Sequence, residues 1–248
     1  QWRPFHRRLA PQSETPRSEF GLMRGVFVTG TDTGVGKTRI SCGLLQGFAR
    51  TGVRSVGMKP VASGAMRTPE GLRNDDALAL QRSASVKLPY DWVNPYAFEP
   101  PIAPHIAASE AGVRIELPVL LDAYAKVCSR GELVVVEGVG GWQVPLAADL
   151  SLPELARALG LPVIMVVGMR LGCLNHALLT ARAIQADGLQ LAGWIANQVD
   201  PEFPRAEQNL TSLRSRLPAP LLGEVPYLSA ERSDDVSDCL ATALQTLA

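Results

Sequence analysis

Short apolar runs alternate with longer amphipathic stretches along most of the chain. The runs are nearly continuous in apolar residues, which is typical of strands that helices cover on both faces. They predict strands at 25–29, 53–59, 133–137, 162–168, 191–196 and 220–225. The stretches between them predict helices at 36–51, 118–129, 152–159, 174–186, 207–217 and 235–247. The alternation predicts an α/β fold, with a doubly wound, mostly parallel sheet, helices on both faces and ligands beyond the carboxyl ends of the strands.

Two segments depart from this alternation. Segment 61–131 shows no clear strand and includes a proline-rich stretch at 94–104. We therefore expect an insertion of helices and loops over the reactive edge of the sheet. Residues 1–22 show neither a strand nor a helix period, and we interpret them as a leader, tag or presequence. Residues 23–248 are then expected to form a single domain.

Charge and composition disfavour several classes of function. The formal net charge of the 248 residues is zero, whereas domains that bind nucleic acid usually carry a basic surplus. No apolar run reaches the roughly 20 residues needed to cross a bilayer. The four cysteines are far apart and form no CxxC pair, which disfavours a zinc site and a disulfide framework. We expect a cytoplasmic protein that has neither a nucleic acid nor a membrane as its partner.

A glycine-rich loop follows the first predicted strand and opens the first predicted helix. Its sequence is Gly-Thr-Asp-Thr-Gly-Val-Gly-Lys-Thr at 30–38, in the strand, loop and helix order that a P-loop requires. Backbone N–H groups at a helix N-terminus form a cradle for phosphate, and glycines let the phosphate approach. The spacing is one residue longer than the standard pattern, so the loop is a variant. The candidate nucleotide contacts are Thr33, Gly34, Val35, Gly36, Lys37 and Thr38.

Oxygen ligands for Mg²⁺ are expected beside such a loop. The Thr38 hydroxyl is one candidate, and Glu137, which ends a predicted strand and precedes a Gly-Val-Gly-Gly run, is another. Asp75 and Asp76 precede a helix-like stretch, so residue chemistry alone leaves capping and metal binding equally open for them. Lys59 ends the second predicted strand. There it could stabilise a transferring phosphoryl group or lie on the surface as an ordinary lysine.

Eight sequence blocks resemble the dethiobiotin synthetase family of ATP-dependent ligases in biotin synthesis. The resemblance covers most of 25–228, and the family's phosphate loop has the same longer spacing. The blocks are TGTDTGVGKT at 29–38, KPVASG at 59–64, TPEGLRNDDALALQ at 68–81, VNPYAFEPPIAPHIAA at 93–108, VEGVGGWQVPL at 136–146, LGCLNHALLT at 171–180, AGWIAN at 192–197 and PAPLLGEVPYL at 218–228. The resemblance implies a P-loop ligase that uses ATP and Mg²⁺, and we expect residues 23–248 to form its single domain, although the final helix lies outside the match.

The resemblance also implies roles for individual residues. Thr38, Asp76 and Glu137 would hold Mg²⁺, which favours metal binding over capping for Asp76. Lys37 and Lys59 would be the catalytic lysines that hold the phosphates and a carbamate.

Three further sets of contacts are implied by the resemblance. The diamine substrate would contact Ser63 and Gly140. The adenine base would contact Asn197, Pro226, Tyr227 and Leu228. The carboxylate of the substrate would bind a loop of the neighbouring subunit, formed by Gly172, Cys173, Leu174 and Asn175. The enzyme would then be a homodimer whose active sites lie at the subunit interface.

The implied reaction joins 7,8-diaminononanoate and CO₂ into dethiobiotin with consumption of ATP. An amine captures CO₂ as a carbamate, the carbamate takes the γ-phosphoryl group, and the neighbouring amine displaces phosphate. Two other P-loop classes are alternatives. A partition or septum-positioning ATPase would carry an extra lysine early in the loop, where this chain has Thr31 and Asp32. An amide-forming ligase of the cobyrinate type would need a glutaminase domain that this length cannot hold.

Overall fold

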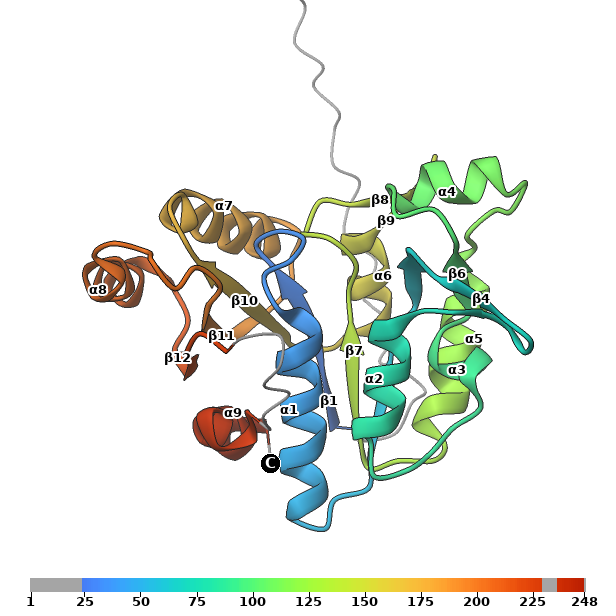
Figure 1. Ribbon diagram of the computed structural model, residues 1–248, viewed down its shortest axis with the longest axis horizontal. Helices are drawn as coiled ribbons and strands as arrows, with labels where there is room; N and C mark the ends of the chain where they lie inside the picture. Colours follow the sequence, from blue (N-terminus) through green and yellow to red (C-terminus); the bar gives the residue numbers. More distant parts are fainter. Residues whose placement is uncertain (1–23, 229–235, 248) are drawn as a thin grey trace, which may run out of the picture.

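Six parallel strands form the central sheet of the computed structural model, which describes residues 24–228 and 236–247 (Figure 1). The strands are β1 (Arg24–Gly30), β2 (Ser55–Met58), β7 (Leu133–Glu137), β10 (Val163–Met169), β11 (Leu191–Gln198) and β12 (Leu221–Val225). Their order across the sheet is β12-β11-β10-β1-β7-β2. All six correspond to predicted strands, so the predicted parallel α/β fold is confirmed. The predicted leader at 1–22 lies outside the described residues.

Helices cover both faces of the sheet. They are α1 (Lys37–Arg50), α2 (Asp75–Ser83), α3 (Tyr90–Val93), α4 (Pro104–Glu110), α5 (Leu117–Cys128), α6 (Leu152–Leu159), α7 (Cys173–Ala186), α8 (Ala206–Arg216) and α9 (Ala241–Leu247). The helix predicted at 235–247 begins as a 3₁₀ turn, Ser237–Leu240, before α9. Among the described helices, none has both the length and the apolar content needed to span a bilayer.

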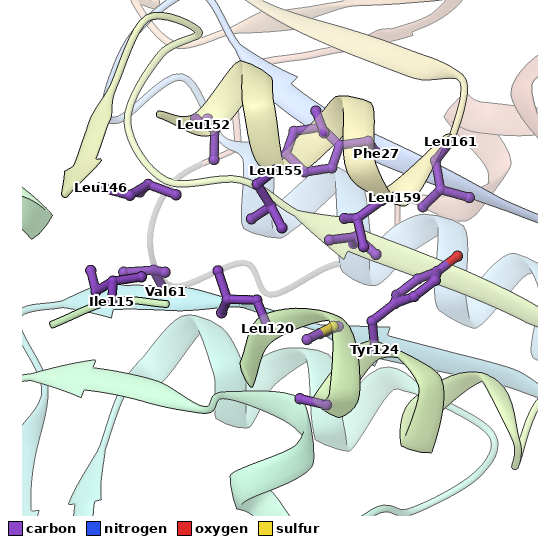
Figure 2. Packing of buried hydrophobic residues seen from close by; sticks show 14 of the residues in the cluster. Phe27, Val61, Ile115, Leu120, Tyr124, Leu146, Leu152, Leu155, Leu159 and Leu161 are labelled. Atoms are coloured by element: carbon purple, nitrogen blue, oxygen red, sulfur yellow. The ribbon is translucent and has the colours of Figure 1, made fainter. Parts of the chain in front are cut away.

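The side chains of β1 are apolar on both faces of the sheet, so both faces must be covered by helices. Successive residues of a strand point to opposite faces. Val26 and Val28 belong to the core under α1 and α9, whereas Phe27 belongs to the core under α5 and α6. Figure 2 shows Phe27 beside leucines of α6, with Leu120 and Tyr124 of α5 on the other side of this cluster. A third cluster packs α7 and α8 against β10 and β11.

The expectation of helices and loops alone in segment 61–131 is wrong. Four short strands lie there: β3 (Val61–Ser63) pairs with β6 (Tyr96–Phe98), and β4 (Met66–Thr68) pairs with β5 (Gly71–Arg73). A further unpredicted hairpin joins β8 (Pro145–Ala147) to β9 (Leu150–Ser151). Strands of two or three residues are too short to show a period in the sequence, which is why the pattern missed them.

The register of the sheet brings three strand ends together. β1 lies between β7 and β10, with Val28 opposite Glu137 and Gly30 opposite Val166. β2 pairs with β7 on its other side, with Met58 opposite Val136. The loop after β1, helix α4 and the β8–β9 hairpin lie along the upper edge of the view in Figure 1. Residues that follow β1, β2 and β7 therefore meet at one edge.

Candidate active site

The glycine-rich loop connects β1 to α1 in a conformation that only glycine adopts readily. Gly34 and Gly36 have φ angles of 75° and 91°, in the left-handed region. A Cβ atom at Gly36 would also collide with the side-chain amide of Asn197. That amide donates a hydrogen bond to the carbonyl oxygen of Val35 at 2.8 Å. The loop is thus tied to β11, and the N–H groups at the start of α1 remain available to an anion.

Lys37 is held over this loop by two backbone oxygens. Its Nζ donates to the carbonyl of Asp32 at 3.1 Å and to that of Gly140 at 2.6 Å. Burial, and then the nearby charge of Lys59, lower the pKa of Lys37 to about 8. A bound phosphate would favour the charged form, so anion binding would raise this pKa and take up a proton near pH 8.

The ion pair between Lys59 and Glu137, close to Lys37, is almost completely buried. The Nζ of Lys59 donates to Glu137 Oε1 at 2.6 Å, to Asp76 Oδ2 at 2.9 Å and to the carbonyl of Gly138 at 3.2 Å. Lys59 is 3% exposed and Glu137 0%. Burial lowers the pKa of Lys59, but the two carboxylates outweigh it and hold that pKa above its ordinary value. Burial likewise raises the pKa of Asp76, but the charge of Lys59 outweighs it, and the net shift is downward.

Three oxygen-bearing side chains meet where a cation could bind beside the loop. The Thr38 hydroxyl donates to Glu137 Oε1 at 2.9 Å, and Asp76 approaches from α2. Glu137 Oε2 is buried with no hydrogen-bond partner among the described residues. Within the described ranges no cluster of three or more His, Cys, Asp or Glu is suited to a metal. A cation here would therefore also need oxygens from a ligand and from water.

Neither Asp75 nor Asp76 caps α2. The N-cap is Asn74, whose Oδ1 accepts a hydrogen bond from the backbone N–H of Ala77 at 3.3 Å. The capping alternative for the two aspartates is therefore wrong. Asp75 is exposed, whereas Asp76 reaches Lys59 in the site.

The phosphate loop and both lysines face one cavity of about 730 Å³. Ten of the predicted site residues line it: Thr33, Gly34, Gly36, Lys37, Thr38, Lys59, Ser63, Asp76, Glu137 and Gly140. Other residues of the lining were not assigned from the sequence, and we call them the apolar wall. They are mainly apolar, with one amide: Pro101, Ile102, Ala103, Pro104, Val139, Gln143, Val144 and Pro145. The proline-rich stretch at 94–104 was the available signal, because it was expected over this edge.

The predicted adenine contacts divide between a second hollow and the loop. Pro226 and Tyr227 line a hollow of about 330 Å³ at the ends of β11 and β12. Asn197 and Leu228 do not line it, and Asn197 instead holds Val35. The Val35 side chain is buried in the core, so Val35 can offer a ligand only its backbone.

The four residues predicted to bind a carboxylate lie at the start of α7. Gly172 is the N-cap, with φ 96°, and the side chain of Cys173 is buried under the helix. Segment 172–175 lines neither cavity of its own chain. The preceding Leu171 is 88% exposed, and Leu179 in the same helix is 57% exposed.

Comparison with known proteins identifies the family. A family model described as an AAA domain matches residues 24–232. A protein of Pseudomonas paraeruginosa named ATP-dependent dethiobiotin synthetase BioD is 56% identical over 208 residues, which cover 84% of this chain and 91% of the relative. Relatives of the same name in Xanthomonas oryzae pv. oryzae and Xylella fastidiosa are 54% and 53% identical, over 81% and 82% of this chain and 90% and 89% of theirs.

The chain belongs to the ATP-dependent dethiobiotin synthetase family. The resemblance drawn from the eight sequence blocks is thereby confirmed, and the chain is an enzyme of the C–N bond-forming ligase class.

Solved structures show the same fold in distant proteins. The MinC:MinD cell division protein complex of Aquifex aeolicus matches with a TM-score of 0.58 and 14% identity, over 90% of this chain and 95% of that one. MinD of the same organism matches with a TM-score of 0.56 and 13% identity, over 90% and 96%. At such identity the likeness concerns the fold alone.

The loop of this chain carries an acid where the regulatory class was expected to carry its extra lysine. Asp32 Oδ2 accepts a hydrogen bond from Arg170 at 2.6 Å, and Asp32 Oδ1 accepts one from the backbone of Thr33 at 2.7 Å. This acid–arginine pair fixes the early part of the loop to the end of β10.

We predict that Lys59→Met lowers the free energy of unfolding by about 3–5 kcal/mol, because it leaves the buried carboxylate of Glu137 without its cation. Urea unfolding in a buffer with a chelator measures the change. Arg67→Met is the matched control, since it breaks the surface pair with Glu99, whose side chains are 78% and 52% exposed. That control is expected to cost less than about 1 kcal/mol. Equal losses in the two variants would contradict the buried-pair argument.

Proposed function

We propose that this protein carboxylates 7,8-diaminononanoate with CO₂ and closes the ring to dethiobiotin, converting ATP to ADP and phosphate. The observation that carries the proposal is the shared cavity. The phosphate loop and the lysines Lys37 and Lys59 line it together with Ser63 and Gly140. The names of the curated relatives support the same assignment.

The nucleotide would lie along the loop with its phosphates at the start of α1. Free N–H groups and the helix dipole favour an anion at that position. The base would lie toward Asn197 and the turn at 226–228. The hollow lined by Pro226 and Tyr227 supports this placement, because an exposed aromatic ring there offers a flat face to a purine.

Mg²⁺ would be held by Thr38, Asp76 and Glu137. The unpartnered, buried Oε2 of Glu137 and the hydroxyl of Thr38 fit a cation that prefers oxygen ligands. When bound, Mg²⁺ neutralises charge that develops on the transferring phosphoryl group. Lys59 would then lose part of its contact with Glu137 and gain freedom to hold an anionic substrate.

The chemistry needs no covalent attachment to the protein. One amine of the diamine adds to CO₂ and loses a proton to give a carbamate. A carbamate oxygen attacks the γ-phosphorus, ADP leaves, and a carbamic-phosphoric anhydride results. The second amine attacks the carbonyl carbon and loses a proton, and phosphate leaves as the ring closes. Lys37 and Lys59 would stabilise the negative oxygens at each stage, and the cavity would supply the alignment.

The long alkyl chain of the substrate would lie against the apolar wall of the cavity. Prolines at 101, 104 and 145, with Ile102 and Val144, supply that wall. Its carboxylate would extend out of the cavity to the 172–175 loop of a second subunit. A fourteen-residue helix begins there, and its free N–H groups suit an anion. The exposure of Leu171 and Leu179 beside it supports a homodimer interface.

We predict that the purified protein forms dethiobiotin from diaminononanoate, bicarbonate and MgATP, detected by mass spectrometry. Lys37→Ala is expected to lose activity by about 10²–10³-fold with the fold intact, because the lysine acts only on the phosphates. Lys126→Ala, which removes a surface lysine paired with Asp122, is the control and should keep full activity. Absence of dethiobiotin with the wild type would refute the proposed function.

We predict that Asp76→Asn raises the Mg²⁺ concentration for half-maximal activity by about tenfold or more, because a charged oxygen ligand is lost. Asn74, and not Asp76, caps α2, so the substitution should leave the helix stable. Asp75→Asn is the matched control, since that neighbouring carboxylate is exposed. A metal titration in which both variants share the wild-type midpoint would remove Asp76 from the metal site.

We predict that the active site is shared between two subunits. Lys37→Ala disables the site of its own chain, and Asn175→Trp should disable the site of its partner. After subunit exchange, each heterodimer then has one native site and recovers about half of wild-type activity, as two-fold symmetry requires. Native mass spectrometry verifies exchange. If heterodimers form and stay inactive, both halves of the site belong to one chain.

A further inference from the structure

The loop that follows β7 carries several contacts of the active site but has little stiffness of its own. Its Gly140 carbonyl accepts from Lys37, its Gly138 carbonyl accepts from Lys59, and Gln143 lines the cavity. Three of the four residues at 138–141 are glycines, which have the greatest conformational freedom to lose. The position of this loop therefore depends on anchors elsewhere.

One of these anchors is a carboxylate oxygen at the far end of α7, in addition to the bonds of Gly138 to Val28 and of Gly141 to Thr29. Asp187 Oδ2 accepts hydrogen bonds from Trp142 Nε1 at 2.7 Å and from Gln143 Nε2 at 3.0 Å. Trp142 is 3% exposed, and its ring meets Phe27 of β1 edge to face, with centroids 6.3 Å apart. Two adjacent loop residues are thus tied to one oxygen that lies 45 and 44 positions away from them in sequence.

The stability of helix α7 gives no reason for an aspartate at position 187. Asp187 is the C-cap of α7, and its backbone N–H, which any residue but proline supplies, bonds to Ala183. A negative charge at a helix C-terminus is unfavourable because it faces the negative end of the dipole. Arg157 offsets this partly, with Nη2 3.7 Å from Asp187 Oδ1. The charge-assisted bonds to the loop are the gain that accounts for the acid.

We propose that Asp187 is a positioning residue, which holds the 138–144 loop through Trp142 and Gln143 so that the loop presents the Gly140 carbonyl to Lys37 and keeps Gln143 in the lining of the cavity. The inference rests on the proposed function for the identity of the substrate. The phosphate loop has separate anchors, Asn197 and Arg170. Loss of Asp187 should therefore disturb the binding of the diamine much more than that of ATP.

The test compares Asp187→Ala, Asp187→Asn and Trp142→Phe with the wild type. Asp187→Ala is expected to raise KM for the diamine and lower kcat, each on the order of tenfold, with a much smaller change in KM for ATP, because a small misplacement of a substrate-positioning group has effects of this size. Asp187→Asn keeps an acceptor oxygen and should restore most of the activity. Trp142→Phe keeps an aromatic ring but loses the indole donor, and it should show part of the effect of Asp187→Ala, since the bond from Gln143 remains. Combining the two should add little to Asp187→Ala, because both remove the bond between Trp142 and Asp187.

A second readout does not depend on activity. Hydrogen exchange of a peptide spanning 138–147 should be faster in Asp187→Ala than in the wild type. Asp122→Ala, which removes a helix carboxylate paired with Lys126 on α5, is the control and should leave the exchange unchanged.

The outcomes separate this inference from the proposed function. The positioning role is overturned if hydrogen exchange in Asp187→Ala is unchanged. It is also overturned if KM for the diamine is unchanged and kcat falls only in proportion to the fraction of folded protein. A wild type that makes no dethiobiotin refutes the proposed function. In that case faster exchange in Asp187→Ala still supports Asp187 as the anchor of the loop.

Discussion

The buried pair between Lys59 and Glu137 is the interaction on which the rest of the site depends. Two charges with 3% and 0% exposure are stable in the interior only if they meet at close range. That condition fixes the end of β2 against the end of β7, and it draws Asp76 of α2 and Thr38 of α1 to the same point. The ends of β2 and β7 and the starts of α1 and α2 therefore meet around these charges, and the phosphate loop lies beside them.

The contacts of Lys37 and Lys59 can change when a nucleotide binds to this site. Lys37 rests on two backbone carbonyls, and burial lowers its pKa to about 8. Neither carbonyl neutralises a full charge, so phosphate oxygens would be better partners. Lys59 already pairs with the carboxylates of Glu137 and Asp76, and a cation bound by Glu137 would weaken the bond between Glu137 and Lys59. In the proposed reaction Lys59 would then be able to direct its charge toward the carbamate.

The sequence predicts the parts of this architecture that have a long period or a local signature. The six parallel strands appear as apolar runs, and helix 152–159 was predicted with the bounds that the structure has. The three-residue strands at 61–63 and 66–68 have too few positions to show alternation. The cap of α2 is ambiguous in Asn-Asp-Asp, because backbone angles decide which side chain caps, and Asn74 adopts the extended angles. The bond from Trp142 to Asp187 joins distant segments, and no local pattern could reveal it.

The fold alone does not specify the proposed chemistry. A cell division protein at 14% identity shares the sheet and its helices, so the fold by itself does not identify a ligase. The part that suits a ligase lies outside the six strands, in the wall from 101–104 and from 143–145. A carbamic-phosphoric anhydride reacts with water, so the proposed reaction requires a cavity that excludes it. If Asp187 positions the loop, the placement of part of that wall, at Gln143, depends on a residue at the far end of α7.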